Sequence, residues 1–192
     1  MHEELESSRE NLDNFVEGIE ELADQNKKSL EIISSKNRDS LQLLKETLGA
    51  LGITYTNNFN FPIVEEFINE GYLAKVENTK IKDELQAFSI QLTQFNNLDN
   101  AINNQYVNAI EPFINKHINY KEVALNRHKK NLVAGGPKTD FDQFHNNLEA
   151  WNIITLKLEL LNSHKYRLQA FIAMIERLTN SLESELQFTS ND

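Results

Sequence analysis

Apolar residues recur along most of this chain at alternating steps of three and four, which is the period of an amphipathic α-helix. The first run covers about residues 1–48, where Asn26 and Asn37 occupy apolar positions of the pattern. We therefore predict a long first helix that ends where Gly49 and Gly52 follow. The apolar positions of this helix are Leu5, Leu12, Val16, Ile19, Ala23, Leu30, Ile33, Leu41, Leu44 and Leu48.

Two further runs predict long helices over residues 79–117 and 151–187. Both repeat every seven residues, which is typical of helices packed in a left-handed bundle. Pro112 predicts either a kink or the start of a separate short helix. The repeating positions are Ile81, Phe88, Phe95, Ile102 and Ala109 with Leu85, Leu92, Asp99, Tyr106 and Phe113 in the second helix, and Ile154, Leu161, Leu168, Ile175 and Leu182 in the last.

Residues 49–78 read as a loop, a short helix and a corner between the first two long helices. Pro62 suits the first turn of the short helix, where its missing N–H would have no partner. Residues 53–60 are predicted to form a loop or a short extended piece. The chain therefore changes direction between the first and second long helices.

The residue types at the corner also predict how the short helix ends and how the next helix begins. Gly71 fits the left-handed position that follows the last turn of a helix, and Phe67 and Tyr72 would then touch across the stop. Asn78 is placed to accept hydrogen bonds from the free N–H groups of the next helix. Pro62, Phe67, Gly71, Tyr72 and Asn78 are therefore predicted to have a structural role.

Residues 118–150 are predicted to form a broken limb. A short helix over about Lys121–Leu132 and another from about Asp140 would flank the turn at Gly135-Gly136-Pro137. Together the runs predict an all-α fold, an elongated antiparallel four-limbed helical bundle in up-down-up-down order with both chain ends at one pole. We expect residues 1–192 to form a single helical bundle domain.

Charge and composition exclude several classes of function. The formal net charge is -10, which argues against nucleic acid and against adsorption to an anionic membrane surface. The chain has no cysteine, so it can form neither a disulfide nor a thiolate site. No apolar run reaches the length of a membrane span, and we find no signal peptide.

Few residues of the chain suggest a catalytic, metal-binding or ligand-binding role. None of the five histidines belongs to a Glu-x-x-His motif or a zincin pair, and His2 and Glu6 sit at a helix end. No phosphate loop, Ser-His-Asp set or carboxylate pair appears, so we expect no enzyme, no metal site and no cofactor. Polar residues within the helical seams, namely Asn37, Asp99 and Lys165, could line a small-molecule site between helices. The alternative, which we favour, is that such residues fix the alignment of the helices or point outward.

The charges are unevenly distributed. Residues 1–24 contain nine acidic side chains and one arginine. In residues 116–138, by contrast, Glu122 is the one acidic side chain among the charged residues, and the others are basic. The acidic helix could contact a basic partner or the basic segment of the same chain, or it could simply be a solvated helix face. The sequence leaves open whether either segment is an interaction surface.

Three stretches resemble an uncharacterised Bacteroidota family of single-pass membrane-anchored proteins with a C-terminal periplasmic helical domain. They are HEELESSRENLDNF, FINEGYLAKVENTKIKDELQAF and YRLQAFIAMIERLTNSLESEL. Glu70, Gly71 and Leu73 match the family's helix stop, but Tyr72 stands where the family has an aliphatic residue. The resemblance implies a location at the periplasmic face of the inner membrane, with an N-terminal membrane helix upstream of this chain. It implies no activity and no functional residues.

We therefore expect a non-enzymatic extracytoplasmic domain that binds or scaffolds a protein partner. A small-molecule sensor with a polar pocket between helices is the first alternative, and a cytoplasmic helical adaptor is the second. The identity of the partner and the oligomeric state, including a homo-oligomer, remain open.

Overall fold

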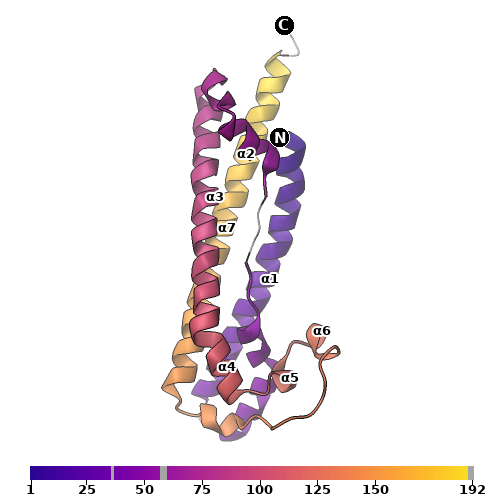
Figure 1. The fold of residues 1–192 in the computed structure, drawn as a ribbon, viewed down its shortest axis with the longest axis vertical. Helices are drawn as coiled ribbons and strands as arrows, with labels where there is room; N and C mark the ends of the chain where they lie inside the picture. The colour runs from indigo at the N-terminus through magenta and orange to yellow at the C-terminus, as the bar shows by residue number, and fades with distance from the viewer. Residues whose placement is uncertain (36, 57–59, 190–192) are drawn as a thin grey trace. The chain divides into compact units, whose positions relative to one another are not determined.

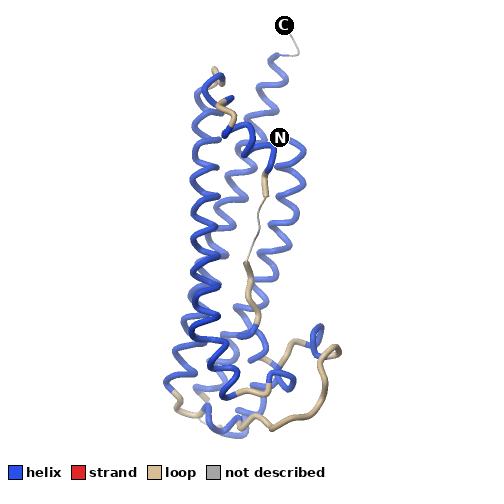
Figure 2. Tube along the Cα trace, in the orientation of Figure 1, coloured by secondary structure: helices blue, strands red, loops and turns tan. Residues whose placement is uncertain are grey.

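The computed structural model describes residues 1–35, 37–56 and 60–189, and leaves undescribed the side chains of residues 96, 188 and 189. None of the described residues lies in a strand, so the chain is all-α as predicted (Figure 2). The α-helices are α1 His2–Ser34, α2 Pro62–Asn69, α3 Thr79–Gln105, α4 Glu111–His117, α5 Tyr120–Val123, α6 Asn126–Lys129 and α7 Leu148–Thr189 (Figure 1). Short 3₁₀ or π segments are η1 Arg38–Glu46, η2 Leu48–Gly52, η3 Tyr72–Lys75, η4 Tyr106–Ile110 and η5 Phe141–Phe144.

The chain divides into two compact units, each with its own buried residues. Unit 1 is Met1–Glu17, Asn57–Asp99 and Lys165–Asp192. Unit 2 is Gly18–Thr56 and Asn100–His164. The single bundle domain over residues 1–192 stays a prediction, and the contacts within the chain group into these two units. Helices α1, α3 and α7 each contribute to both.

Aromatic side chains fill the core of unit 1. The ring of Phe61 meets the ring of Phe88 edge to face at 4.9 Å, and Phe171 stacks beside Phe88 at 5.0 Å and Phe95 at 5.1 Å. Such pairs add about 0.5–1.5 kcal/mol each beyond the area they bury. These rings come from α3, α7 and the residue preceding α2, so the aromatic core joins three elements.

The first turns of α1 lie beside the C-terminal half of α7 in unit 1, in line with the prediction that both chain ends lie at one pole. Arg9 of α1 forms a salt bridge of 2.9 Å with Glu176 of α7, and His2 approaches Glu183. Residue numbers therefore rise along α1 as they fall along α7, which makes the two helices antiparallel in this unit.

The stop at the corner has the predicted geometry. Gly71 has a φ of 77°, in the left-handed region, and the rings of Phe67 and Tyr72 lie 5.7 Å apart. The side chain of Asn78 accepts hydrogen bonds from the backbone N–H groups two and three residues later, and its amide donates to Glu185. The predictions for Phe67, Gly71, Tyr72 and Asn78 are confirmed.

The start of α2 has a feature that the sequence did not indicate. Pro62 lies in its first turn, as predicted. The carboxylate of Glu4 accepts hydrogen bonds from the backbone N–H groups of Ile63 and Val64 at 3.0 and 3.1 Å. A carboxylate at this position satisfies free N–H groups and favours the positive end of the helix dipole. Residues 57–59 of the predicted loop lie outside the described residues.

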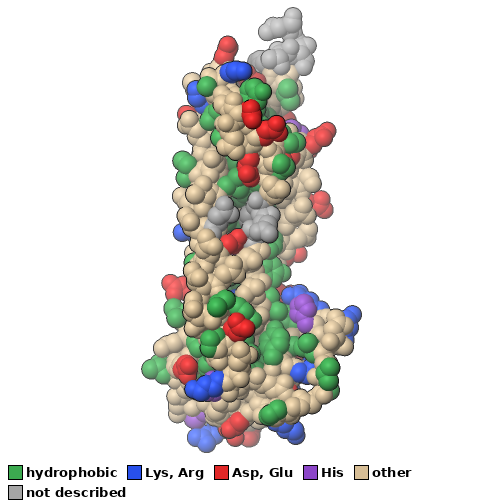
Figure 3. Space-filling model, viewed as in Figure 1, with side chains coloured by type: hydrophobic (Ala, Val, Ile, Leu, Met, Phe, Trp, Pro, Cys, Tyr) green, Lys and Arg blue, Asp and Glu red, His purple; other side chains and the backbone are tan. Residues whose placement is uncertain are grey.

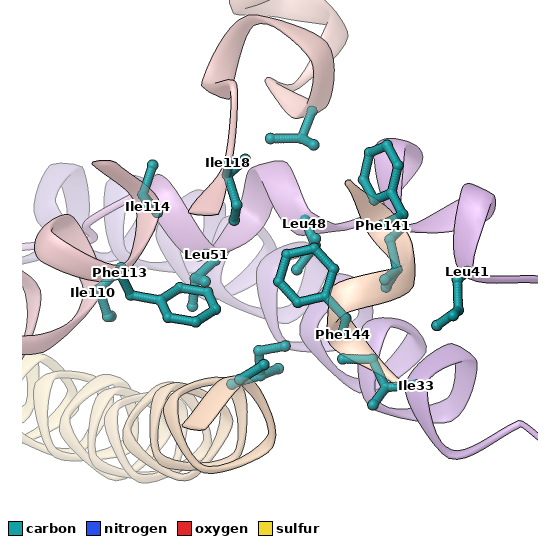
Figure 4. Close-up of a cluster of buried hydrophobic side chains, with 14 residues drawn as sticks. Ile33, Leu41, Leu48, Leu51, Ile110, Phe113, Ile114, Ile118, Phe141 and Phe144 are labelled. Atoms are coloured by element: carbon teal, nitrogen blue, oxygen red, sulfur yellow. The ribbon is translucent and has the colours of Figure 1, made fainter. Parts of the chain in front are cut away.

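The core of unit 2 is an apolar cluster drawn from most of its elements (Figure 4). Tight packing around η2 requires a glycine, since a Cβ at Gly49 would overlap the carbonyl oxygen of Val123. We had assigned Gly49 to the end of the first helix, and its actual role is this close approach to α5. The cluster comprises Ile33, Leu41, Leu44, Leu48, Leu51, Ile110, Phe113, Ile114, Ile118, Val123, Phe141, Phe144, Ala150 and Ile154.

The prediction that the first helix reaches residue 48 is wrong. Helix α1 ends at Ser34, and the chain continues as η1 and η2. The hydroxyl of Ser35 accepts from the N–H of Asn37, and the side chain of Asn37 accepts from the N–H of Asp39. Side chains of this kind compete with helical backbone bonds and favour a new start.

The second long helix is also interrupted. It is α-helical to Gln105, π-helical over η4, and α-helical again in α4 with Pro112 in its first turn. Pro112 thus starts a separate short helix, which was one of the two outcomes predicted. The wider π turn inserts one residue, so Ile102 is followed in the core by Ile110 rather than by Ala109.

Residues 118–150 form three short turns of helix, and all of them belong to unit 2. The predicted helix over 121–132 is wrong, because the backbone at Ala124 and Leu125 is extended between α5 and α6. The second predicted helix begins as η5, with Asp140 as its N-cap. The last long helix starts at Leu148, three residues before the predicted start.

Candidate functional site

A hollow of about 590 Å³ in unit 2 is lined by three of the basic side chains of the 116–138 segment. Four lysines line it, and the only carboxylate in its lining belongs to Glu122. We call this feature the lysine hollow. Its lining residues are Gln42, Lys45, Lys121, Glu122, Lys129, Ala134, Gly135, Gly136, Lys138, Thr139 and Phe141. Basic side chains gather around the segment that carries α6 (Figure 3).

Asn119 holds the loop that forms one wall of the lysine hollow. Its side-chain amide donates to the carbonyl oxygens of Gly135 at 3.0 Å and Pro137 at 2.8 Å. Its backbone N–H donates to the hydroxyl of Thr139 at 2.9 Å. Gly135 and Gly136 have φ values of 117° and 87°, which few other residues adopt. The loop therefore has fixed ends and a backbone that depends on the two glycines.

Two of the lysines are oriented by backbone groups. The ammonium of Lys121 donates to the carbonyl oxygen of Lys129, and the ammonium of Lys129 donates to the carbonyl oxygen of Glu122 at 2.8 Å. These bonds position the ammonium groups but leave their charges uncompensated, since a carbonyl is neutral. The charge of the hollow therefore remains positive.

The carboxylate of Glu122 already has a partner. Its oxygen accepts the backbone N–H of Thr139 at 2.7 Å. This hydrogen bond lowers the pKa of Glu122, and Lys138 and Lys129 lower it further. Glu122 is thus ionised near neutral pH and offsets one of the four lysine charges.

Arg127, in the same basic 116–138 segment, forms a salt bridge with a carboxylate of α1. Its guanidinium lies 3.3 Å from the carboxylate of Glu21 on α1. One contact between the acidic helix and the basic segment, an alternative left open by the sequence, is therefore present within unit 2.

The three residues proposed to line a pocket between helices are divided between the two units. Asn37 is an exposed cap of η1 in unit 2, whereas Asp99 and Lys165 are partly buried in unit 1. None of the three lines the lysine hollow. A small-molecule site at these residues stays a prediction.

The buried cation of the structure is a residue that the sequence analysis missed. Lys157 is 1% exposed, and its ammonium donates to the carbonyl oxygen of Ile53 at 2.8 Å. Burial lowers the pKa of Lys157 to about 8. Its position, three residues after the buried Ile154 and four before the buried Leu161, was the available signal.

His2 also has neighbours that its sequence position did not indicate. Its Nε2 lies 2.7 Å from Glu183 and its Nδ1 lies 3.7 Å from Glu6. In the described ranges this is the one group of three side chains whose His, Asp or Glu ligand atoms all lie within 4.8 Å of one another.

None of the described helices is long and apolar enough to cross a membrane. The resemblance to membrane-anchored periplasmic proteins therefore rests on its three sequence stretches alone. Comparison of the chain with family models, with curated proteins and with solved structures gave no match.

Proposed function

We propose that this chain is a non-enzymatic binding domain that holds an acidic segment of a protein partner in the lysine hollow. The observation that carries this proposal is the set of four lysines around one hollow, offset only by Glu122, in a chain whose net charge is -10. A local positive site on an acidic protein attracts anionic groups, whereas the rest of the acidic surface repels them. The lysine hollow is thus the place where an acidic partner would gain most.

The chemistry of the lining supports a peptide segment as the occupant. Lysine is a point charge on a flexible stem, so it accepts carboxylates in many orientations. Exposed ion pairs contribute about 0.2–1 kcal/mol each, so the four lysines alone support weak binding that falls further with salt. Leu132 and Val133, next to the hollow in sequence, are 39% and 91% exposed and offer apolar contact to a polypeptide.

The same lining supports the non-enzymatic part of the proposal. Its titratable groups are ammonium groups and one carboxylate, and that carboxylate is held by Thr139. An acid–base mechanism needs a free group near the operating pH. We therefore assign the lysines to charge recognition.

Binding of a fluorescein-labelled glutamate-rich peptide, followed by fluorescence anisotropy, tests the proposal. The variant K45E/K138E reverses two charges of the hollow at exposed side chains without touching the bonds of Lys121 or Lys129. The matched control K27E/K130E changes the net charge equally at exposed lysines outside the hollow. We expect the first variant to weaken binding at least about tenfold and the control to change it little. Equal loss in both, or no binding by the wild type, would refute the proposal.

A small anionic ligand is the second candidate, because 590 Å³ lies within the range of about 300–1,000 Å³ that small-molecule sites occupy. This is the sensor hypothesis transferred from the helical seam to the lysine hollow. Pyrophosphate and citrate serve as probes in a thermal-shift assay. Stabilisation by either that K45E/K138E abolishes, in a protein that ignores the acidic peptide, would favour the sensor.

The location is proposed from the family resemblance alone: the periplasmic face of the inner membrane, with an anchor upstream of this chain. The alternative is a cytoplasmic adaptor. Membrane fractionation of native cells, followed by external protease on intact cells and on spheroplasts, separates the two. Retention in membranes with digestion only in spheroplasts supports the periplasmic proposal, and a soluble, protected protein refutes it.

A further inference from the structure

The lysine hollow has no matching carboxylate among the residues that the structure describes. The salt bridges of those residues involve His2, Arg9, His117 and Arg127, and none of the four lysines of the hollow. With Glu122 held by Thr139, the hollow keeps an excess of three positive charges. Its occupant must therefore present several carboxylates close together.

The first five turns of α1 carry such a surface. Glu3, Glu6, Glu10, Asp13 and Glu17 follow one another at steps of three and four, so they share one face of the helix. All five side chains are exposed, and all lie in unit 1. We call this surface the acidic face. It presents one carboxylate about every 5 Å along the helix axis, since a helix rises about 1.5 Å per residue.

Within the described residues of its own helix, the acidic face has one contact with a basic side chain, between Glu6 and the ring of His2 at 3.7 Å. The buried residues Leu5, Leu12 and Val16 occupy the neighbouring face, and Arg9, the one basic side chain within residues 3–17, pairs with Glu176 of α7. Like charges three and four residues apart on a helix repel each other. A cationic surface that covers the acidic face would relieve this repulsion.

We infer that the acidic segment bound in the lysine hollow is the acidic face of a second copy of this chain, an inference that rests on the proposed function. Charge complementarity is the first support: the hollow requires clustered carboxylates, and the acidic face supplies five. The second is the pair between Arg127 and Glu21 at 3.3 Å, in which the basic segment already binds a carboxylate of α1 within one chain.

The contact joins two different surfaces, the lysine hollow of unit 2 and the acidic face of unit 1. Both surfaces are exposed and charged, so the association should be reversible and depend on salt. At an ionic strength of 0.1 M the screening length is about 10 Å. We expect self-association at low salt that is largely lost above about 0.3 M sodium chloride.

Sedimentation velocity of the full chain over a range of concentrations tests the inference. The hollow variant is K45E/K138E and the acidic-face variant is D13K/E17K, both built at exposed side chains. Their matched controls are K27E/K130E and E66K/E77K, which make the same charge changes elsewhere on the exposed surface. Circular dichroism confirms that each variant keeps its helix content.

We expect the wild type and both controls to associate as concentration rises, and each test variant to weaken association at least about tenfold. Mixing the two test variants should restore association, because each supplies the surface that its partner needs. Both variants keep a net negative charge, so overall attraction between the chains cannot explain that recovery.

Three outcomes would overturn the inference: a wild type that stays monomeric at low salt, controls that lose association as much as the test variants, or a mixture that shows no recovery. If the wild type is monomeric but still binds the glutamate-rich peptide through the hollow, the proposed function stands and self-recognition fails. If the peptide also fails to bind, both fail.

Discussion

Lys157 provides the sharpest test of the structure, because a buried ammonium with a neutral partner is costly. Its side chain is 1% exposed, and its hydrogen bond goes to the carbonyl oxygen of Ile53. We consider the variant Lys157→Met, which keeps the unbranched side chain and removes the charge. The free energy of unfolding as a function of pH is the quantity to measure.

The magnitude follows from the pKa. Burial lowers the pKa of Lys157 from 10.5 to about 8. Each pKa unit corresponds to about 1.36 kcal/mol, so burying the charged form costs about 3 kcal/mol. The variant avoids this cost but leaves the Ile53 carbonyl without its donor, which costs about 1–3 kcal/mol. At pH 7 we therefore expect a change in stability of less than about 2 kcal/mol, in either direction.

The pH dependence separates these two opposing contributions. Because the pKa is lowered in the folded state, the unfolded chain binds more protons between pH 8 and pH 10.5. Stability contributed by Lys157 is therefore gained as pH rises through that window. Relative to Lys157→Met, the wild type should gain up to about 3 kcal/mol from pH 8 to pH 10.5.

Urea unfolding at a series of pH values measures this difference. Trp151, the single tryptophan, lies in unit 2 with Lys157, so its fluorescence reports the relevant unit. Lys165→Met, at a partly buried position in unit 1, is the control. Parallel pH profiles for the wild type and Lys157→Met would show that Lys157 is solvated, and would refute the reasoning.

Three substitutions test local features, each by thermal or urea unfolding. Gly71→Val should cost more than about 1 kcal/mol through backbone strain alone, since nothing lies within 4 Å of its would-be Cβ; an unchanged melting curve would contradict the helix stop. Asn78→Ala should cost about 1 kcal/mol by removing a helix cap, whereas Asn78→Ser should retain the cap without placing a second carboxylate beside Glu185. Gly49→Ala should cost about 2 kcal/mol or more, because its methyl group would overlap the backbone of Val123; wild-type stability would mean that α5 packs elsewhere.

The corner was predictable because its chemistry is local. A proline at a helix start, a glycine at the stop and an asparagine before the next helix each satisfy neighbouring backbone groups. The early end of α1 was missed, although it also depends on local bonds, because the apolar period continues through Leu41, Leu44 and Leu48. These leucines are buried in η1 and η2 instead. Periodicity thus identified the buried residues correctly while giving the wrong backbone conformation.

The buried polar residues of α7 show a different limit of prediction from the sequence. In α7 we had placed Lys165 among the polar residues of the helical seam and had placed neither Lys157 nor His164 there. The structure buries Lys157 and His164, at 1% and 0% exposure. A pattern based on hydrophobicity alone does not predict a buried lysine, because burying a charge is costly. The burial of Lys157 is possible because the 53–56 segment supplies the carbonyl oxygen of Ile53 as its hydrogen-bond acceptor.

The lysine hollow depends on contacts that no periodic pattern encodes. Lys45 comes from η1, whereas Lys121, Lys129 and Lys138 come from a segment more than seventy residues later. The sequence showed the excess of positive charge in residues 116–138, but a charged run alone is equally typical of a solvated surface. Bonds from Asn119 to the loop and from Thr139 to Glu122 convert that run into a hollow whose single carboxylate is already engaged. Those bonds leave the lysine charges uncompensated, so the positive hollow is a product of the fold and not of the composition.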